Sequence, residues 1–265
     1  MRQGECYEQR GRSGSRGLLG TKYSQALRLW RGGVRLYRAS EDGGDWYERR
    51  PRPRTSTDTG NEYTLLISEF LPSWRGFPKR NRCVIAAGRR GSAKEYLSPG
   101  RALYCVLPAD GALVAVAPSE DMWDSFPRLR EFDIATINEF NGALTRLLSA
   151  MCGGVRTARD IASMFAGSDT EALSALFRAA EDNVRRRGSD VRGRACGGLF
   201  AGFMISGVER GRSIVSLLDE VLSPEANGFT ARRLDCLRRV DTEAWTDADC
   251  LLVKCAAAER LLNRA

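Results

Sequence analysis

The apolar pattern of this chain changes character at Pro127, and no other feature of the sequence constrains its fold as strongly. Before this residue, short apolar runs are separated by Gly, Pro and Asp, which is the pattern of β-strands and turns. After it, apolar residues recur at three- and four-residue spacing, which is typical of amphipathic helices. We therefore expect an α+β domain over residues 21–130, followed over 131–265 by an all-α domain or a helical layer wrapped onto the first.

The individual runs predict the strands and helices of this arrangement. In the first part, strands are expected at 34–38, 83–87, 102–107 and 112–117, and helices at 23–30, 62–70 and 92–96. The last two strands are joined through Asp110-Gly111, a dipeptide typical of β-hairpin turns. In the second part, helices are expected at 132–151, 158–165, 170–186, 195–208, 213–222, 230–240 and 247–263. Residues 1–20 are poor in apolar side chains and predict a basic arm that is flexible or bound to a partner.

Charge is unevenly distributed along the chain. The net charge is +8 over 265 residues, of which 43% are hydrophobic, an ordinary composition for a globular protein. Residues 1–130 hold 23 Lys and Arg against 14 Asp and Glu, whereas residues 131–265 hold 18 against 19. The first part is therefore expected to attract polyanions such as nucleic acid or a phosphate-bearing cofactor.

The chain contains no histidine, which excludes several classes of chemistry. Nucleophiles activated by histidine, histidine general bases and histidine-ligated metals are impossible without a partner chain. The eight cysteines are scattered and include no C-x-x-C pair, so neither a zinc site nor a disulfide framework is expected. We predict reduced thiols and no metal site.

The longest nearly uncharged apolar stretch, residues 196–208, has 13 residues, and a membrane-spanning helix needs about 20. The arginine-rich N-terminus has no apolar segment behind it, so no secretory signal is expected. These features predict no membrane span and a location in a cytoplasm, such as that of an infected host cell, or in a virion.

Several short motifs occur one after another between Arg38 and Asp121. An arginine on an early strand, Arg38, precedes the polar run 54–63, the strand 83–87 and the segment 92–96. Two further strands flank Pro108-x-x-Gly111, and the acidic pair Glu120-Asp121 comes last. Over roughly residues 20–126 this order resembles the ADP-ribosyltransferase fold, in particular ADP-ribosyltransferase-fold proteins of bacteriophages. The resemblance implies a mixed α+β domain with a split β-sheet, NAD as cofactor, and transfer of ADP-ribose from NAD to a side chain of a target protein.

The resemblance also implies a role for individual residues. Arg38 matches the arginine that holds the NAD phosphates and ribose, a task that suits the forked donors of a guanidinium. Glu120 matches the glutamate that binds ribose and steadies the oxocarbenium-like transition state. The remaining residues expected in the cofactor site are Tyr37, Ser92, Tyr96 and Arg54. From the residues alone, Arg38 can equally be a solvated charge at a strand end, and Glu120 can belong to the cap of a helix that begins at Asp121.

The chain departs from the family in one motif. The family has Ser-Thr at the end of the strand that follows Pro-Lys-Arg, and this chain has Ala87-Gly88 there. The hydroxyls that brace the cofactor must then come from Ser92 or from residues 55–59, and transferase activity is left open.

Basic and aromatic residues interleave at 46–54 and 74–82, which suggests a second function. Such stretches can stack on bases while neutralising phosphates, or they can be buried tryptophans with arginines in water. The first interpretation predicts a non-catalytic virion or nucleoprotein component that contacts nucleic acid or neighbouring subunits. Its polyanion patch would be Arg49, Arg50, Arg52, Arg80 and Arg82.

Overall fold

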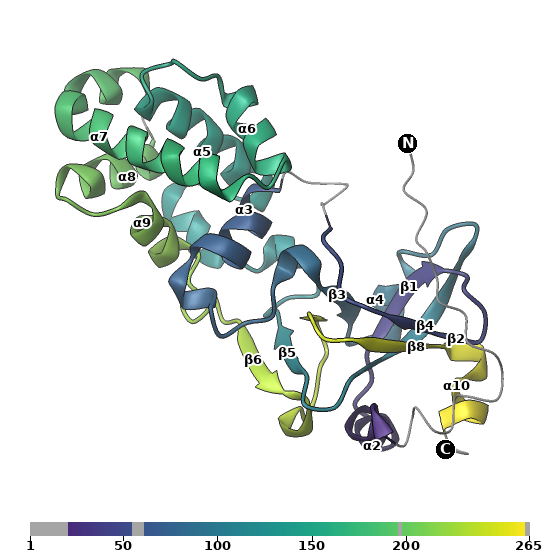
Figure 1. The fold of residues 1–265 in the computed structure, drawn as a ribbon. Helices are drawn as coiled ribbons and strands as arrows, with labels where there is room; N and C mark the ends of the chain where they lie inside the picture. The colour runs from purple at the N-terminus through teal and green to yellow at the C-terminus, as the bar shows by residue number, and fades with distance from the viewer. Residues whose placement is uncertain (1–20, 55–60, 196–197, 263–265) are drawn as a thin grey trace. The chain divides into compact units, whose positions relative to one another are not determined.

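The computed structural model describes residues 21–54, 61–195 and 198–262. The chain divides into two compact units. The first, here called the sheet unit, comprises residues 1–53, 77–121 and 230–265, and the second, the helical unit, comprises 54–76 and 122–229. The structure is therefore a mixture of helices and an antiparallel sheet, as the α+β prediction required (Figure 1).

The sheet unit is built on one eight-stranded sheet with the order β2-β8-β4-β1-β3-β7-β5-β6. Every neighbouring pair in this order is antiparallel. The strands are β1 Tyr37–Glu41, β2 Trp46–Arg49, β3 Val84–Ala87, β4 Arg101–Pro108, β5 Leu113–Val116, β6 Thr230–Arg233, β7 Glu243–Thr246 and β8 Cys250–Lys254. The predicted strands at 83–87, 102–107 and 112–117 are thereby confirmed.

Short helices accompany this sheet: α2 Ser24–Arg31, α4 Arg90–Lys94, α10 Cys255–Leu262, and 3-10 turns at Arg80–Arg82 and Leu234–Cys236. The buried face of α2 presents Ala26, Leu27 and Trp30, whose spacing follows the helical repeat. They join one apolar core with buried side chains of β4 and β8, including Val106 and Leu252.

Three sequence-based predictions for this unit were wrong. The strand at 34–38 begins instead at Tyr37. β4 and β5 are not a hairpin, because β4 pairs with β1 and β8 while β5 pairs with β6 and β7. The connecting turn binds α2: the Asp110 carboxylate accepts hydrogen bonds from Ser24 Oγ and from the Gln25 backbone N–H.

The third error concerns the end of the chain, where residues 131–265 are not helical throughout. The predicted helices at 230–240 and 247–263 are replaced by β6, β7, β8 and the short α10. The run Leu251-Leu252-Val253 is apolar on both sides because β8 lies between β2 and β4, and such a run does not reveal its secondary structure by periodicity. The all-α prediction therefore holds only up to Phe229, where the helical unit ends.

In the helical unit the predictions were largely confirmed. Its helices are α3 Glu62–Leu65, which continues as a π-turn Leu66–Phe70, then α5 Ile137–Met151, α6 Ala158–Ala166, α7 Thr170–Arg194, α8 Leu199–Glu209 and α9 Ile214–Val221, with 3-10 turns at Pro72–Trp74, Met122–Asp124 and Pro127–Phe132. Thr136, Thr157, Asp169 and Ser213 each accept a backbone N–H of the helix that they precede. These N-caps explain why the helices begin where they do. In the described residues, no helix combines the length and apolar character needed to cross a bilayer.

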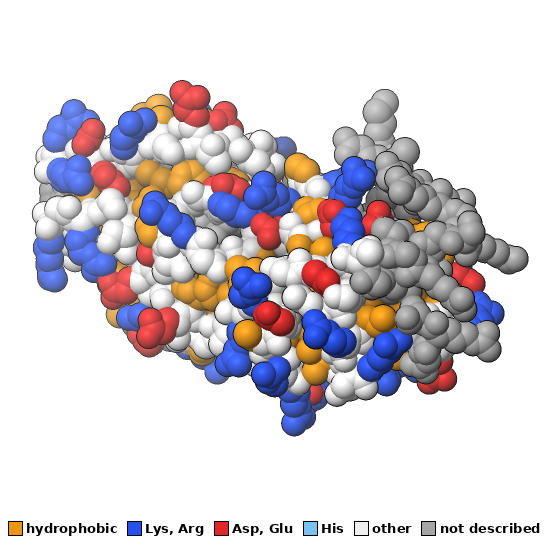
Figure 2. All heavy atoms as spheres, turned by 60° about the horizontal axis from the view of Figure 1, so that its bottom comes forward, with side chains coloured by type: hydrophobic (Ala, Val, Ile, Leu, Met, Phe, Trp, Pro, Cys, Tyr) orange, Lys and Arg blue, Asp and Glu red, His pale blue; other side chains and the backbone are white. Residues whose placement is uncertain are grey.

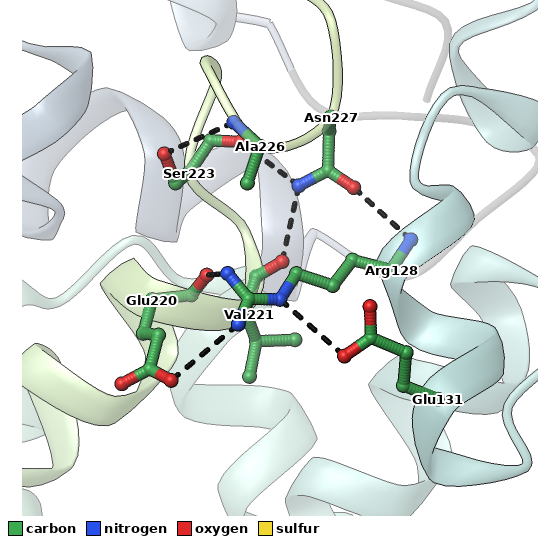
Figure 3. Close-up of polar contacts among 7 residues, drawn as sticks. All are labelled: Arg128, Glu131, Glu220, Val221, Ser223, Ala226 and Asn227. Carbon is green, nitrogen blue, oxygen red and sulfur yellow. Dashed lines mark hydrogen bonds and ion pairs between the residues drawn. The ribbon is translucent and has the colours of Figure 1, made fainter.

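A network of hydrogen bonds joins the end of α9 and the residues after it to Arg128 (Figure 3). The buried Asn227 donates to the carbonyls of Val221 and Ser223 and accepts the backbone N–H of Arg128. The Arg128 guanidinium donates to the Glu220 carbonyl and lies 3.6 Å from the Glu131 carboxylate. The carbonyls at the end of α9, which no helical N–H can reach, are thereby satisfied.

Candidate functional site

Arg38 is fixed by the sheet rather than solvated at a strand end. It is the second residue of β1, lies opposite Tyr104 of β4 and is half-buried. Its Nη1 donates a 2.8 Å hydrogen bond to the carbonyl of Ile85 on β3. The guanidinium is therefore held by the backbone of β3, while Arg38 itself stays half-buried near the start of β1.

Tyr37 does not share a surface with Arg38. Successive side chains of a strand point to opposite faces of the sheet, and Tyr37 lies opposite Cys105 and Ala87. The Cys105 side contacts α10 through Cys255. The predicted cofactor residues Tyr37 and Arg38 therefore point to opposite faces of the sheet.

Ser92 and Glu120 meet, although 28 residues separate them in the chain. Ser92 Oγ, on α4, donates to Glu120 Oε2 at 3.0 Å, and Arg89 Nη1 donates to Oε1 at 2.6 Å. The Arg89 and Glu120 side chains are 57% and 50% exposed, so solvent screens their attraction and a ligand can reach the carboxylate. We call Arg89, Ser92 and Glu120 the carboxylate cluster.

Sequence reasoning did not single out Arg89, since an arginine next to another arginine after a strand carries no motif. The signal that was available is its place between Gly88 and Ser92 in a segment already assigned to the site.

The carboxylate oxygens of Glu120 accept hydrogen bonds from the side chains of Arg89 and Ser92. This is the arrangement of an oriented carboxylate rather than of a helix cap.

The packing around Gly88 leaves no room for a side chain. The N–H of Gly88 donates to the Thr242 carbonyl at 2.8 Å, and a Cβ at this position would lie 2.2 Å from the carbonyl oxygen of Val240. Contacts that short are excluded by sterics, so only glycine fits here without movement of the backbone. A hydroxyl-bearing side chain cannot occupy position 88 in this packing.

The other predicted cofactor residues are not gathered at the carboxylate cluster. Tyr96 follows α4 and is 58% exposed, and its carbonyl accepts Arg101 Nη1. Arg54 belongs to the helical unit. Residues 55–59, the alternative source of hydroxyls, lie outside the described residues.

The predicted polyanion patch is not uniform. Arg80 is buried, forms a 2.6 Å ion pair with Glu243 and lies over the ring of Trp245, so it supports the fold and is not exposed to a ligand. Arg82 is 56% exposed and lies 3.8 Å from Asp247. Arg50 and Arg52 are exposed, and Arg49 is half-buried on β2.

The sheet unit carries the positive charge of the whole protein. Its three segments hold 26 Lys and Arg against 16 Asp and Glu, a net charge of +10, while the helical unit holds 15 against 17. Division by structure thus separates the charges slightly more than division at residue 130, because 230–265 joins the sheet unit. Figure 2 shows blue Lys and Arg side chains spread over the face that it brings forward.

Two further observations concern metal binding and thiol chemistry among the described residues. No group of three or more Cys, Asp or Glu side chains among them is arranged to hold a metal ion. The thiols of Cys105 and Cys255 lie 3.5 Å apart, and their hydrogen bond lowers the pKa of Cys105 and raises that of Cys255.

Comparison of the chain with family models, with curated proteins and with solved structures gave no match.

Proposed function

We propose that the sheet unit is an NAD-binding domain of the ADP-ribosyltransferase type, which transfers ADP-ribose from NAD to a side chain of a target protein. The observation that supports this proposal is the hydrogen bond between Ser92 and Glu120. The resemblance assigns both residues to one site, although they are distant in the sequence and neither their spacing nor their type requires them to meet.

The cluster has the chemistry that glycosyl transfer needs. In the proposed reaction the bond between the ribose C1′ and nicotinamide breaks, and a nucleophile of the acceptor forms the new bond to C1′. The Glu120 carboxylate would stabilise the positive charge that develops on the ribose, or accept a hydrogen bond from a ribose hydroxyl. Arg89 and Ser92 hold that carboxylate in one orientation, and a preoriented group costs little reorganisation during the reaction.

Arg38 would bind the NAD diphosphate. A guanidinium has five N–H donors, and the bond to Ile85 fixes its plane with one of them. The forked geometry matches two phosphate oxygens at once, which lysine cannot do. An Arg38→Lys variant is therefore expected to lose most NAD binding even though the charge is kept.

The test is binding and transfer with NAD. At about 100 times its dissociation constant, NAD should add about 2.7 kcal/mol and raise the melting temperature by about 5–10 °C. Glu120→Gln should keep this shift and abolish the transfer of labelled ADP-ribose to proteins of a host lysate. Glu259→Gln, an exposed residue of α10, is the matched control and should change neither. No shift and no labelled product with the wild-type protein would refute the proposal.

A second candidate is supported by the charge of the sheet unit. A net charge of +10 on one unit favours a non-catalytic virion or nucleoprotein component that contacts nucleic acid. Charge reversal of Arg50 and Arg52 should then weaken DNA binding equally for all sequences and reduce its salt dependence, whereas Arg38→Ala should have no special effect. Binding that does not weaken as salt rises would exclude this candidate.

A further inference from the structure

A groove lined by arginines lies at the C-terminal end of α2, and no residue of the predicted patch lines it. It consists of two adjoining hollows of about 350 and 340 Å³. Both hollows are lined by Gly32, Val34 and Arg238, so they lie next to each other and are treated together as one groove. Its four arginines are Arg28, Arg35, Arg238 and Arg239, and we call it the arginine groove.

Two carboxylates, Asp235 and Asp241, line the arginine groove beside its four arginines, which leaves a net charge of +2. Arg239 is paired with Asp241, while Arg238 donates only to the carbonyl of Asp235. Arg35 lies 4.7 Å above the ring of Trp30. The Arg28 carbonyl accepts the Gly32 N–H, whereas its exposed guanidinium makes no hydrogen bond or ion pair with the described residues. Three exposed guanidinium groups thus face the groove without a carboxylate partner among those residues, an arrangement that attracts an anion.

Three of the lining residues are glycines, next to apolar side chains such as Leu29, Val34 and Leu237. Gly32, Gly33 and Gly88 contribute no side chain to the groove. Gly33 has a φ of +89°, which ends α2 by allowing the N–H groups of Gly33 and Val34 to reach the carbonyls of Trp30 and Leu29. A Cβ at Gly33 would meet no atom within 4 Å, so the space above it is open to a ligand.

The shape and chemistry indicate which anion fits. Guanidinium groups match phosphate oxygens, and several along an open groove match phosphates that repeat along a chain. Trp30 is buried and therefore offers no ring for a base to stack on. We propose that the arginine groove binds the sugar-phosphate backbone of nucleic acid. This binding depends neither on the proposed transfer of ADP-ribose nor on the predicted patch.

The experiment compares two double variants of the full chain with equal change in charge. Arg28→Glu/Arg238→Glu alters the groove, and Arg178→Glu/Arg210→Glu alters exposed arginines of the helical unit. Binding of a labelled DNA duplex of about 30 base pairs is measured by anisotropy over a range of salt concentrations. The groove variant should bind at least about tenfold more weakly, and its salt slope should fall by about 1.8 if two phosphate contacts are lost. The control should change affinity less than about twofold.

Equal losses for the two double variants would overturn the proposal, because net charge alone would then explain binding. Inorganic pyrophosphate that displaces the duplex at stoichiometric concentration would also overturn it, since the site would then take a small phosphate ligand. The thermal shift with NAD should be unchanged in the groove variant. Failure of the groove and failure of the transferase proposal are thereby separate results, and melting curves confirm that both variants fold.

A different observation carries a second inference. The Sγ atoms of Cys105 on β4 and Cys255 at the start of α10 lie 3.5 Å apart, and a disulfide needs about 2.05 Å. Cys105 is buried and Cys255 is half-buried, so a small oxidant approaches the pair from the side of Cys255. We infer that these two cysteines form a reversible disulfide under peroxide. Hydrogen bonding from Cys255 lowers the pKa of Cys105, and the positive charges of Arg35 and Arg90 lower it further.

Hydrogen peroxide alone supplies the two-electron oxidation that converts the two thiols to a disulfide. The Cys105 thiolate attacks one peroxide oxygen and becomes a sulfenic acid, and the departing oxygen takes up the proton that the thiol released and leaves as water. The Cys255 thiol then attacks the sulfenic sulfur, the S–S bond forms, and a second water leaves. Two thiols are oxidised and one peroxide is reduced to two waters.

Peptide mapping after peroxide treatment tests this inference. The wild type should lose two hydrogens in a peptide pair that links Cys105 to Cys255, and dithiothreitol should restore them. Cys255→Ser should instead stop at a trappable sulfenic acid on Cys105, while Cys236→Ser, which removes an exposed thiol, should behave as the wild type. Both thiols remaining free, or a cross-link to another cysteine, would overturn it.

Discussion

Replacement of Gly88 by alanine is the sharpest test of the packing described above. The added Cβ would lie 2.2 Å from the oxygen and 2.4 Å from the carbon of the Val240 carbonyl, so it meets backbone that cannot rotate away. Overpacking of this kind costs about 1–3 kcal/mol, and a shift of this backbone also weakens the hydrogen bond from Gly88 to Thr242, which contributes about 1 kcal/mol. We expect Gly88→Ala to lower the free energy of unfolding by about 2–4 kcal/mol.

Gly91 supplies the matched control, because it lies in α4 three residues later and its added Cβ would meet nothing within 4 Å. Alanine is the better helix former, so Gly91→Ala should stabilise the protein by about 0.5–1 kcal/mol. Urea unfolding followed by circular dichroism measures both variants. A Gly88→Ala protein with the wild-type midpoint would refute the close approach of Gly88 to the Val240 backbone.

Three further predictions concern polar groups. Asn227→Ala removes three hydrogen bonds and leaves buried backbone groups unsatisfied, so the free energy of unfolding should fall by about 2–4 kcal/mol in urea titrations. Tyr104→Phe leaves the buried N–H of Gly43 without its acceptor and should cost about 1–2 kcal/mol by the same assay, whereas an unchanged midpoint would contradict this role. The hydrogen bond from Lys254 lowers the pKa of Asp42 below its usual 3.8. A lowered pKa stabilises the fold above pH 3.8, and that contribution is lost as pH falls through the folded value, so Asp42→Asn should flatten the acid limb of a stability–pH curve.

The candidate site was only partly predictable from the sequence. Ser92 and Glu120 were assigned to one site by the order of motifs, and they do meet. Tyr37 and Arg38 are adjacent in a strand and must point to opposite faces, which the alternation already implied. The same alternation placed the start of the strand three residues too early. The burial of Arg80 depends on Glu243 and Trp245, which lie more than 160 residues away in the sequence.

The arginine groove could not be derived from the sequence at all. Arg28 and Arg35 flank a helix end near the N-terminus, while Arg238 and Arg239 belong to a segment whose pattern predicted a helix. They line one groove because β6 and the turn after it join the sheet unit.

The sequence by itself determined that α5 to α9 are helices, because helical hydrogen bonds join residues four apart, although α5 begins at Ile137 and α8 at Leu199, later than the predicted 132 and 195. It also determined that 83–87, 102–107 and 112–117 form strands. Only the tertiary structure decided the partners of those strands, the return of 230–262 to the sheet and the residues that meet around Glu120. The physical reason is that strand pairing is satisfied by hydrogen bonds to residues anywhere in the chain, so local pattern restricts the partners without selecting them.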